Sequence, residues 1–190
     1  MQDTAGYSGG FADAPRQSAQ AFRATLNALA RPGVIETLAG AVPPAPLSVA
    51  AGVLLLTLAD GTTPLHLAGG HDLPLLRRWI AFHTGAPFVP AEQAVFALGT
   101  WDALAPLARF ATGTAQYPDR GATLIVEMAA LEPATHRLTG PGIRDAAHLR
   151  VPDMAAFRAN AALFPLGLDF LFTADDRVAA LPRTTKVEPL

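Results

Sequence analysis

The residues with the clearest chemical potential are Asp169 and the run Arg183-Thr184-Thr185, near the end of the chain. Apolar stretches on either side of Asp175-Asp176 predict a closing hairpin, and the hairpin brings the carboxylate close to the guanidinium and the two hydroxyls. A carboxylate inside an apolar strand needs a partner, because burying it alone is costly. Two interpretations stay open: an ion pair that closes the hairpin, which we favour, and a recognition site for a polar ligand or a partner backbone.

Two further places carry reactive side chains. Arg31, before Pro32-Gly33, ends a predicted helix, where its planar fork suits a phosphate or phosphonate; an exposed arginine that complements the helix dipole is the commoner case. His83-Thr84 also ends a predicted helix, where histidine serves as a general base or in a structural role. The candidate residues for binding a ligand or a partner are Arg31, His83, Thr84, Asp169, Arg183, Thr184 and Thr185.

The sequence lacks the residues that several common kinds of catalytic, metal and cofactor site require. The sequence has no Gly-rich phosphate loop. The spacing GxSxG occurs once, at residues 6–10 in the predicted arm, and it does not lie between a predicted strand and a helix as a nucleophile elbow does, so serine catalysis is not expected. The absence of cysteine excludes disulfides, thiolate metal sites and a cysteine nucleophile, and the five histidines show no metal-ligand spacing, so no metal site is expected. Lys186 is the single lysine and lies four residues from the end. We therefore expect no cofactor, and no pyridoxal phosphate (PLP) on an interior lysine.

Composition limits the kinds of partner. A length of 190 residues with 51% hydrophobic content predicts one domain, and a charged fraction of only 16% suggests that another chain covers part of the surface. The net charge of −2 predicts neither nucleic acid nor an anionic membrane as a partner. The apolar run 47–59 is too short to span a bilayer, and residues 1–10 do not resemble a signal peptide, so we expect a cytoplasmic protein.

The pattern of elements predicts a flexible N-terminal arm, 1–12, and a single α/β domain, 13–190. Helices are expected at 14–30, 49–59, 73–84 and 154–163, capped by Asp13, Ser48, Asp72 and Asp153, with an ambiguous helix at 101–110. Strands are expected at 34–38, 63–68, 94–98, 122–131 and 135–139, before the closing hairpin. Residues 122–131 read as a strand in mid-sheet. The alternation predicts a three-layer α/β/α arrangement around a mixed sheet.

An ordered set of short phrases resembles one known family. It includes Arg31-Pro32-Gly33, Phe82-His83-Thr84, Gly121-Ala122-Thr123-Leu124, Phe164-Pro165-Leu166-Gly167 with Asp169, and Leu181-Pro182-Arg183-Thr184-Thr185. The chain is similar over roughly residues 13–188 to the PhnH family, subunits of the bacterial carbon–phosphorus lyase system of phosphonate metabolism. The resemblance carries over no catalytic residue.

The resemblance implies a fold like that of PLP-dependent transferases, without the cofactor. It also implies a homodimer that joins subunits G, I and J in a core complex. That complex forms α-D-ribose 1-methylphosphonate 5-triphosphate from methylphosphonate and ATP, and this chain is expected to have a scaffolding or accessory role in it. Two alternatives stay open. One is a true small-molecule site in which Arg31, His83, Arg183 and Thr184 bind a phosphonate or a nucleotide. The other is an independent enzyme on the transferase-like fold that acts on a phosphonate or a nucleotide.

Overall fold

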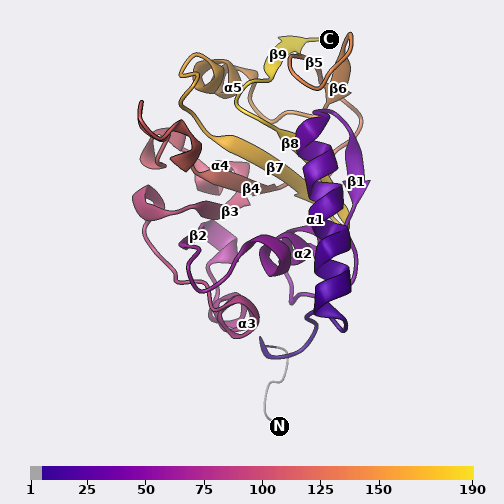
Figure 1. The fold of residues 1–190 in the computed structure, drawn as a ribbon, viewed down its shortest axis with the longest axis vertical. Helices are drawn as coiled ribbons and strands as arrows, with labels where there is room; N and C mark the ends of the chain where they lie inside the picture. The colour runs from indigo at the N-terminus through magenta and orange to yellow at the C-terminus, as the bar shows by residue number, and fades with distance from the viewer. Residues whose placement is uncertain (1–5) are drawn as a thin grey trace.

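A six-stranded mixed sheet forms the centre of the molecule in a computed structural model that describes residues 6–190 (Figure 1). The strand order is β1-β8-β7-β4-β3-β2, in which β2, β3, β4 and β7 are parallel and β8 is antiparallel to both β7 and β1. The six strands are β1 (Ile35–Thr37), β2 (Leu65–Leu67), β3 (Phe96–Thr100), β4 (Thr123–Glu127), β7 (Asp169–Ala174) and β8 (Arg177–Leu181). The predicted mixed sheet is confirmed, and β4 lies inside it.

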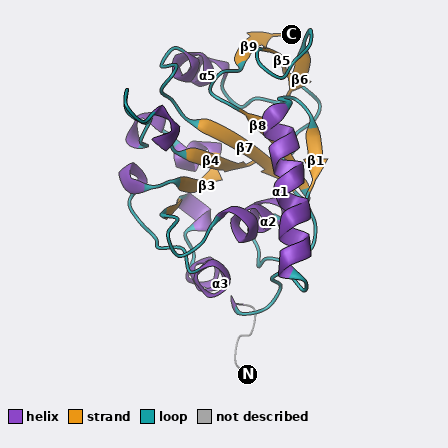
Figure 2. Cartoon of the chain, viewed as in Figure 1, coloured by secondary structure: helices purple, strands orange, loops and turns teal. Residues whose placement is uncertain are grey.

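Side chains that alternate along the strands build a separate core on each face of the sheet. Leu98, Ile125 and Leu171 belong to one core, with residues of α1 (Ala14–Ala30), α2 (Val49–Leu58) and α3 (Pro74–Thr84). Leu124 and Phe170 belong to the other, with residues of α4 (Trp101–Leu104) and α5 (Met154–Ala161). The predicted α/β class is therefore confirmed, with helices on both faces (Figure 2). The likeness to PLP-dependent transferases stays a prediction.

Three of the four predicted helix caps are present. The side chains of Asp13, Ser48 and Asp153 each accept a hydrogen bond from a backbone N–H in the first turn of α1, α2 and α5. The prediction that Asp72 caps α3 is wrong: the helix begins at Pro74 after Leu73, since the fixed φ of proline suits the first helical position. Asp72 instead accepts hydrogen bonds from Nε and Nη2 of Arg77, the latter at 3.0 Å.

This pair has a consequence for pH dependence. Hydrogen bonds from Arg77 hold the pKa of Asp72 below its usual value of 3.8, so the pair adds stability above that value and loses it as pH falls through the lower, folded-state pKa. Both side chains are more than a third exposed, so solvent keeps the contribution small. In Arg77→Gln, we expect the pKa of Asp72 to rise in an NMR pH titration. Asp60, whose pKa is lowered by Thr62 and Thr63, is the internal control and should keep its pKa; an unchanged Asp72 would refute this assignment.

A second, smaller sheet lies beside the main one (Figure 1). Its antiparallel strands, in the order β6-β5-β9, are β5 (His136–Thr139), β6 (Ala147–Leu149) and β9 (Lys186–Pro189). Only β5 was predicted. The other two were missed because strands of three and four residues with polar and charged positions carry almost no apolar alternation.

Two predicted boundaries need correction. The ambiguous helix at 101–110 ends at Leu104, and a short 3-10 turn follows at Leu107–Arg109, because Pro106 cannot continue a helix. The central strand ends at Glu127, four residues before its predicted end.

The predicted N-terminal arm lies partly outside the described residues, which begin at Gly6. In its described part, the carbonyl of Ser8 accepts a 2.7 Å hydrogen bond from Nε1 of Trp79, and the carbonyl of Gly9 accepts one from the backbone of Val42. These contacts attach the segment to α3 and to the loop before α2. None of the helices within residues 6–190 has the length and apolar character needed to cross a membrane.

Candidate functional site

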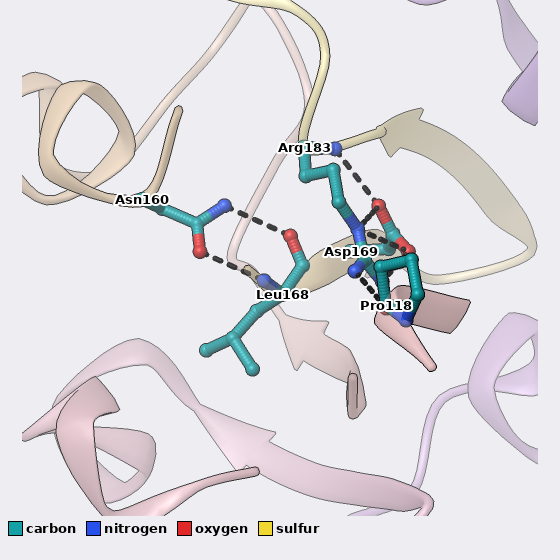
Figure 3. A network of polar contacts seen from close by, with 5 residues as sticks. All are labelled: Pro118, Asn160, Leu168, Asp169 and Arg183. Atoms are coloured by element: carbon teal, nitrogen blue, oxygen red, sulfur yellow. Dashed lines mark hydrogen bonds and ion pairs between the residues drawn. The ribbon is translucent and has the colours of Figure 1, made fainter. Parts of the chain in front are cut away.

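Asp169 and Arg183 form a multidentate ion pair, named here the hairpin latch (Figure 3). Asp169 is the first residue of β7, and Arg183 follows the end of β8, so the antiparallel pairing of Phe170 with Leu181 brings them together. The backbone N–H of Arg183 donates to Oδ1 at 2.8 Å, Nη2 donates to Oδ2 at 2.6 Å, and Nη1 donates to the carbonyl of Pro118 at 2.7 Å. The predicted proximity is confirmed, whereas a ligand-binding role for these residues stays a prediction.

The surroundings of the hairpin latch favour a structural role. The Arg183 side chain is 10% exposed and that of Asp169 25%. A Cβ on Gly121 would lie 2.3 Å from the carbonyl oxygen of Gly167 and 3.0 Å from the Arg183 guanidinium, so the guanidinium packs against bare backbone. Each of the three side-chain nitrogens of Arg183 already donates to a protein acceptor. The latch also lies at the amino edge of the parallel strands, whereas ligands in open α/β sheets bind at the carboxyl edge.

The two threonines after the latch have different environments. Thr184 lines a shallow depression of about 480 Å³ together with Pro118, Asp119 and Phe164. Thr185 is buried, and its Oγ1 has no hydrogen-bond partner in the described part of the chain. The only cation among the described residues of the depression is Arg183, which Asp169 already neutralises. The depression is therefore poorly suited to an anion.

Asn160, which the sequence did not single out, braces the approach to the latch (Figure 3). Its Nδ2 donates to the Leu168 carbonyl at 2.9 Å, and its Oδ1 accepts from the Leu168 N–H at 2.8 Å. The side chain thereby satisfies both backbone groups of the residue directly before Asp169.

Asn160→Ala is expected to lower the free energy of unfolding by about 2 kcal/mol, because it leaves both buried Leu168 backbone groups without a partner. Urea denaturation measures this loss. The control is Asn27→Ala on α1, where a partly buried side-chain amide donates to the Glu36 carboxylate and satisfies no backbone group of residues 6–190, so a smaller loss is expected. Equal losses in the two variants would contradict the bracing role.

The remaining candidates lie in two other places. Arg31 is exposed at the end of α1, next to Gly33, which packs against Ala147 of the small sheet. His83 lies between the rings of Trp79 and Phe82, at the end of α3.

Structural contacts already occupy much of the α3 end. Gly10 closes over the His83 ring, since a Cβ on Gly10 would lie 2.5 Å from it. The Thr84 hydroxyl donates to the Ile80 carbonyl at 2.8 Å and accepts from the Ala86 N–H at 3.1 Å. Between residues 6 and 190, no hydrogen bond or ion pair joins Arg31, His83 and Arg183. These three residues therefore share no hydrogen-bonded anion site within the described part of the chain.

A polar row that the sequence did not reveal lies at the carboxyl edge of the sheet. Thr100, Glu127 and Thr173 are paired across β3, β4 and β7. They lie one step beyond the buried row Leu98, Ile125 and Leu171 on the same face. The available signal was a charged residue directly after the apolar run 124–126. It was missed because the strand was predicted to continue to residue 131.

Glu127 is the centre of this edge. Its Oε1 accepts from the Ser48 N–H at 2.8 Å, and its Oε2 accepts from the Thr173 hydroxyl at 3.0 Å. Nε2 of His71 lies 3.9 Å from Oε1, and the side chains of His71 and Glu127 are only 7% and 9% exposed. Because Ser48 caps α2, the carboxylate lies at the positive end of that helix dipole.

An open crevice of about 900 Å³ adjoins this carboxylate. Its wall includes His71, Glu127, Asp175 and Asp176, with apolar surface from the segment before α2 and from Met128. The described residues hold no group of three or more His, Cys, Asp or Glu side chains suited to a metal ion. The crevice has the position at which α/β proteins commonly bind ligands.

The chain is a mixed α/β protein, and hydrogen bonds from its own groups hold the carboxylate of each candidate site, Asp169 in the latch and Glu127 at the carboxyl edge. The chain belongs to the PhnH family of bacterial phosphonate metabolism proteins, whose family model matches residues 9–188.

Two relatives agree with this assignment. The chain is 42% identical over 191 residues to a subunit of Rhizobium meliloti (strain 1021) named alpha-D-ribose 1-methylphosphonate 5-triphosphate synthase subunit PhnH, with 96% of each chain covered. It is 33% identical over 184 residues to the putative C-P lyase subunit protein HtxG of Stutzerimonas stutzeri, covering 92% of this chain and 87% of the relative.

Proposed function

We propose that this chain is a scaffolding or accessory subunit of the assembly that forms α-D-ribose 1-methylphosphonate 5-triphosphate in phosphonate breakdown. The observation that carries the proposal is similarity over nearly the whole length of both chains to a subunit of that synthase. The site geometry supports an accessory role, because Asp169 already engages the Arg183 guanidinium in an ion pair. The expected partners are subunits G, I and J, in the cytoplasm.

An exposed apolar surface on α1 supports assembly. Phe22 and Leu26 are 52% and 53% exposed, and exposed Ala19 and Ala30 continue the same helix face. These four residues, named here the α1 stripe, lie opposite the buried Ala21, Thr25 and Ala28. A stripe of this kind is self-complementary when two copies of a helix cross on a two-fold axis, so it supports a homodimer through α1.

The position of the single lysine supports action without PLP. Lys186 is exposed at the start of β9 in the small sheet, away from the residues that line the carboxyl-edge crevice. A Schiff base in that crevice needs a lysine that the described lining does not supply.

Co-purification with subunits G, I and J tests the subunit role. The chain is expected to elute with them as one complex, whereas the chain alone is expected to show no heat of binding with ATP or methylphosphonate in calorimetry. Binding and turnover of both compounds by the isolated chain, with no stable complex, would instead establish an independent enzyme.

A further inference from the structure

The carboxyl-edge crevice has an unbalanced negative charge. Glu127, Asp175 and Asp176 line it, and none of its described lining residues is Arg or Lys. The Asp175-Asp176 turn is anchored through its backbone, because the Asp175 carbonyl accepts from the Ala50 N–H at 2.8 Å and the Asp176 carbonyl accepts from the Leu38 N–H at 2.7 Å. The two carboxylates are therefore not needed to hold the turn, and both residues are exposed.

Three backbone N–H groups at the start of α2 already have acceptors. The Ser48 N–H donates to Glu127, the Ala50 N–H to the Asp175 carbonyl, and the Ala51 N–H to the Ser48 hydroxyl. A phosphate or phosphonate at this helix end would have to displace Glu127 and would face Asp175 and Asp176. Electrostatics thus exclude a free anion from this place and favour a cation.

His71 independently indicates a missing partner. Its side chain is 7% exposed and lines the crevice, and its Nδ1 is buried with no hydrogen-bond partner among the described residues. In the tautomer with its proton on Nε2, the ring nitrogen that lies 3.9 Å from Glu127 Oε1, Nδ1 is an acceptor. Buried polar atoms in folded proteins are nearly always paired, so this nitrogen calls for an N–H or O–H donor.

We propose that this crevice binds a cationic hydrogen-bond donor, a guanidinium or alkylammonium group, with Glu127, Asp175 and Asp176 as its acceptors and His71 as a further one. Each Glu127 oxygen accepts one hydrogen bond from the protein and keeps acceptor capacity for a ligand. Pro46, Leu47 and Met128 offer apolar surface to the hydrocarbon stem of such a group. The cation comes either from a free small molecule or from a side chain of a partner subunit.

The first experiment uses the isolated chain and NMR. Methylguanidinium and butylammonium are expected to shift the amide resonances of Ser48, Glu127 and Asp176 saturably, whereas phosphate and methylphosphonate at equal ionic strength should not. In the double variant that carries both Asp175→Asn and Asp176→Asn, the affinity for methylguanidinium is expected to fall about tenfold. Glu92→Gln, an exposed carboxylate outside the crevice, is the matched control and should leave affinity unchanged. Absence of cation-specific shifts, or equal shifts with phosphate, would overturn the proposal.

Glu127→Gln removes the central charge and should abolish binding. If Glu127→Gln shows no cooperative unfolding, and so is not folded, the double variant at Asp175 and Asp176 decides the outcome. That variant should fold, because the backbone hydrogen bonds of the turn remain.

A second experiment, which rests on the proposed subunit role, identifies the source of the cation. Weaker assembly of the Asp175/Asp176 variant with its partners, together with competition by methylguanidinium in the wild type, would identify a partner side chain. Unchanged assembly with retained methylguanidinium binding would identify a small molecule. Because the first experiment needs no partner, failure of the proposed function and failure of this inference are distinguishable.

Discussion

Replacing Arg183 with alanine is expected to lower the free energy of unfolding by about 3 kcal/mol, at the lower end for a broken buried ion pair. The change leaves the Asp169 carboxylate, 25% exposed, without its guanidinium, and the Pro118 carbonyl without its donor. Urea denaturation followed by circular dichroism measures the loss as a shift of the midpoint at constant slope. Arg183→Lys should lose an intermediate amount of free energy of unfolding, because lysine keeps the positive charge but lacks the planar guanidinium that donates to several acceptors at once.

Two controls separate the hairpin latch from general effects. Arg120→Ala removes an exposed arginine that stacks on Tyr117 beside the same depression and should change stability by less than about 0.5 kcal/mol. Adding Asp169→Asn to Arg183→Ala should restore part of the lost stability, because the uncompensated charge is gone. An Arg183→Ala variant of unchanged stability that no longer supports the assembly would show the latch to be a recognition site.

Charge on the α1 stripe is expected to have the largest effect on assembly. Phe22→Glu with Leu26→Glu places two carboxylates on the proposed two-fold contact, and losing two central apolar anchors should weaken the dimer by about a thousandfold. Sedimentation velocity measures the shift from dimer to monomer. Stability of the monomer should change little, because both side chains are about half exposed in the isolated chain.

Gln20→Glu is the matched control for the α1 stripe. It adds a carboxylate to an exposed position on the same helix, away from the line of Ala19, Phe22, Leu26 and Ala30, and should leave the dimer intact. A double glutamate variant that stays dimeric would place the dimer contact elsewhere on the molecule.

Local signals predicted much of the fold. The starts of three helices could be predicted from their N-cap residues, Asp13, Ser48 and Asp153, because an N-cap depends only on the next few residues of the chain. The closing hairpin was also accessible, since β7 and β8 are consecutive. The small sheet could not be predicted in this way. Its strands β5 and β9 pair across about fifty residues of chain, and short polar strands carry no sequence pattern that indicates such a pairing.

The same distinction explains the two candidate sites. Asp169 and Arg183 meet through a single hairpin, so their proximity followed from the sequence. Glu127 meets Ser48, His71 and Thr173 only through the parallel pairing of the sheet and the packing of α2 on it. No short-range spacing encodes that arrangement, and a single Glu after an apolar strand is its only trace.

Product formation by the reconstituted assembly tests the subunit role of this chain most directly. Subunits G, I and J are combined with methylphosphonate and ATP, with and without this chain, and α-D-ribose 1-methylphosphonate 5-triphosphate is measured by ³¹P NMR. Product is expected only when this chain is present, and replacement of the α1 stripe is expected to abolish it. Equal product without the chain, or product from the chain alone, would contradict its role as a subunit.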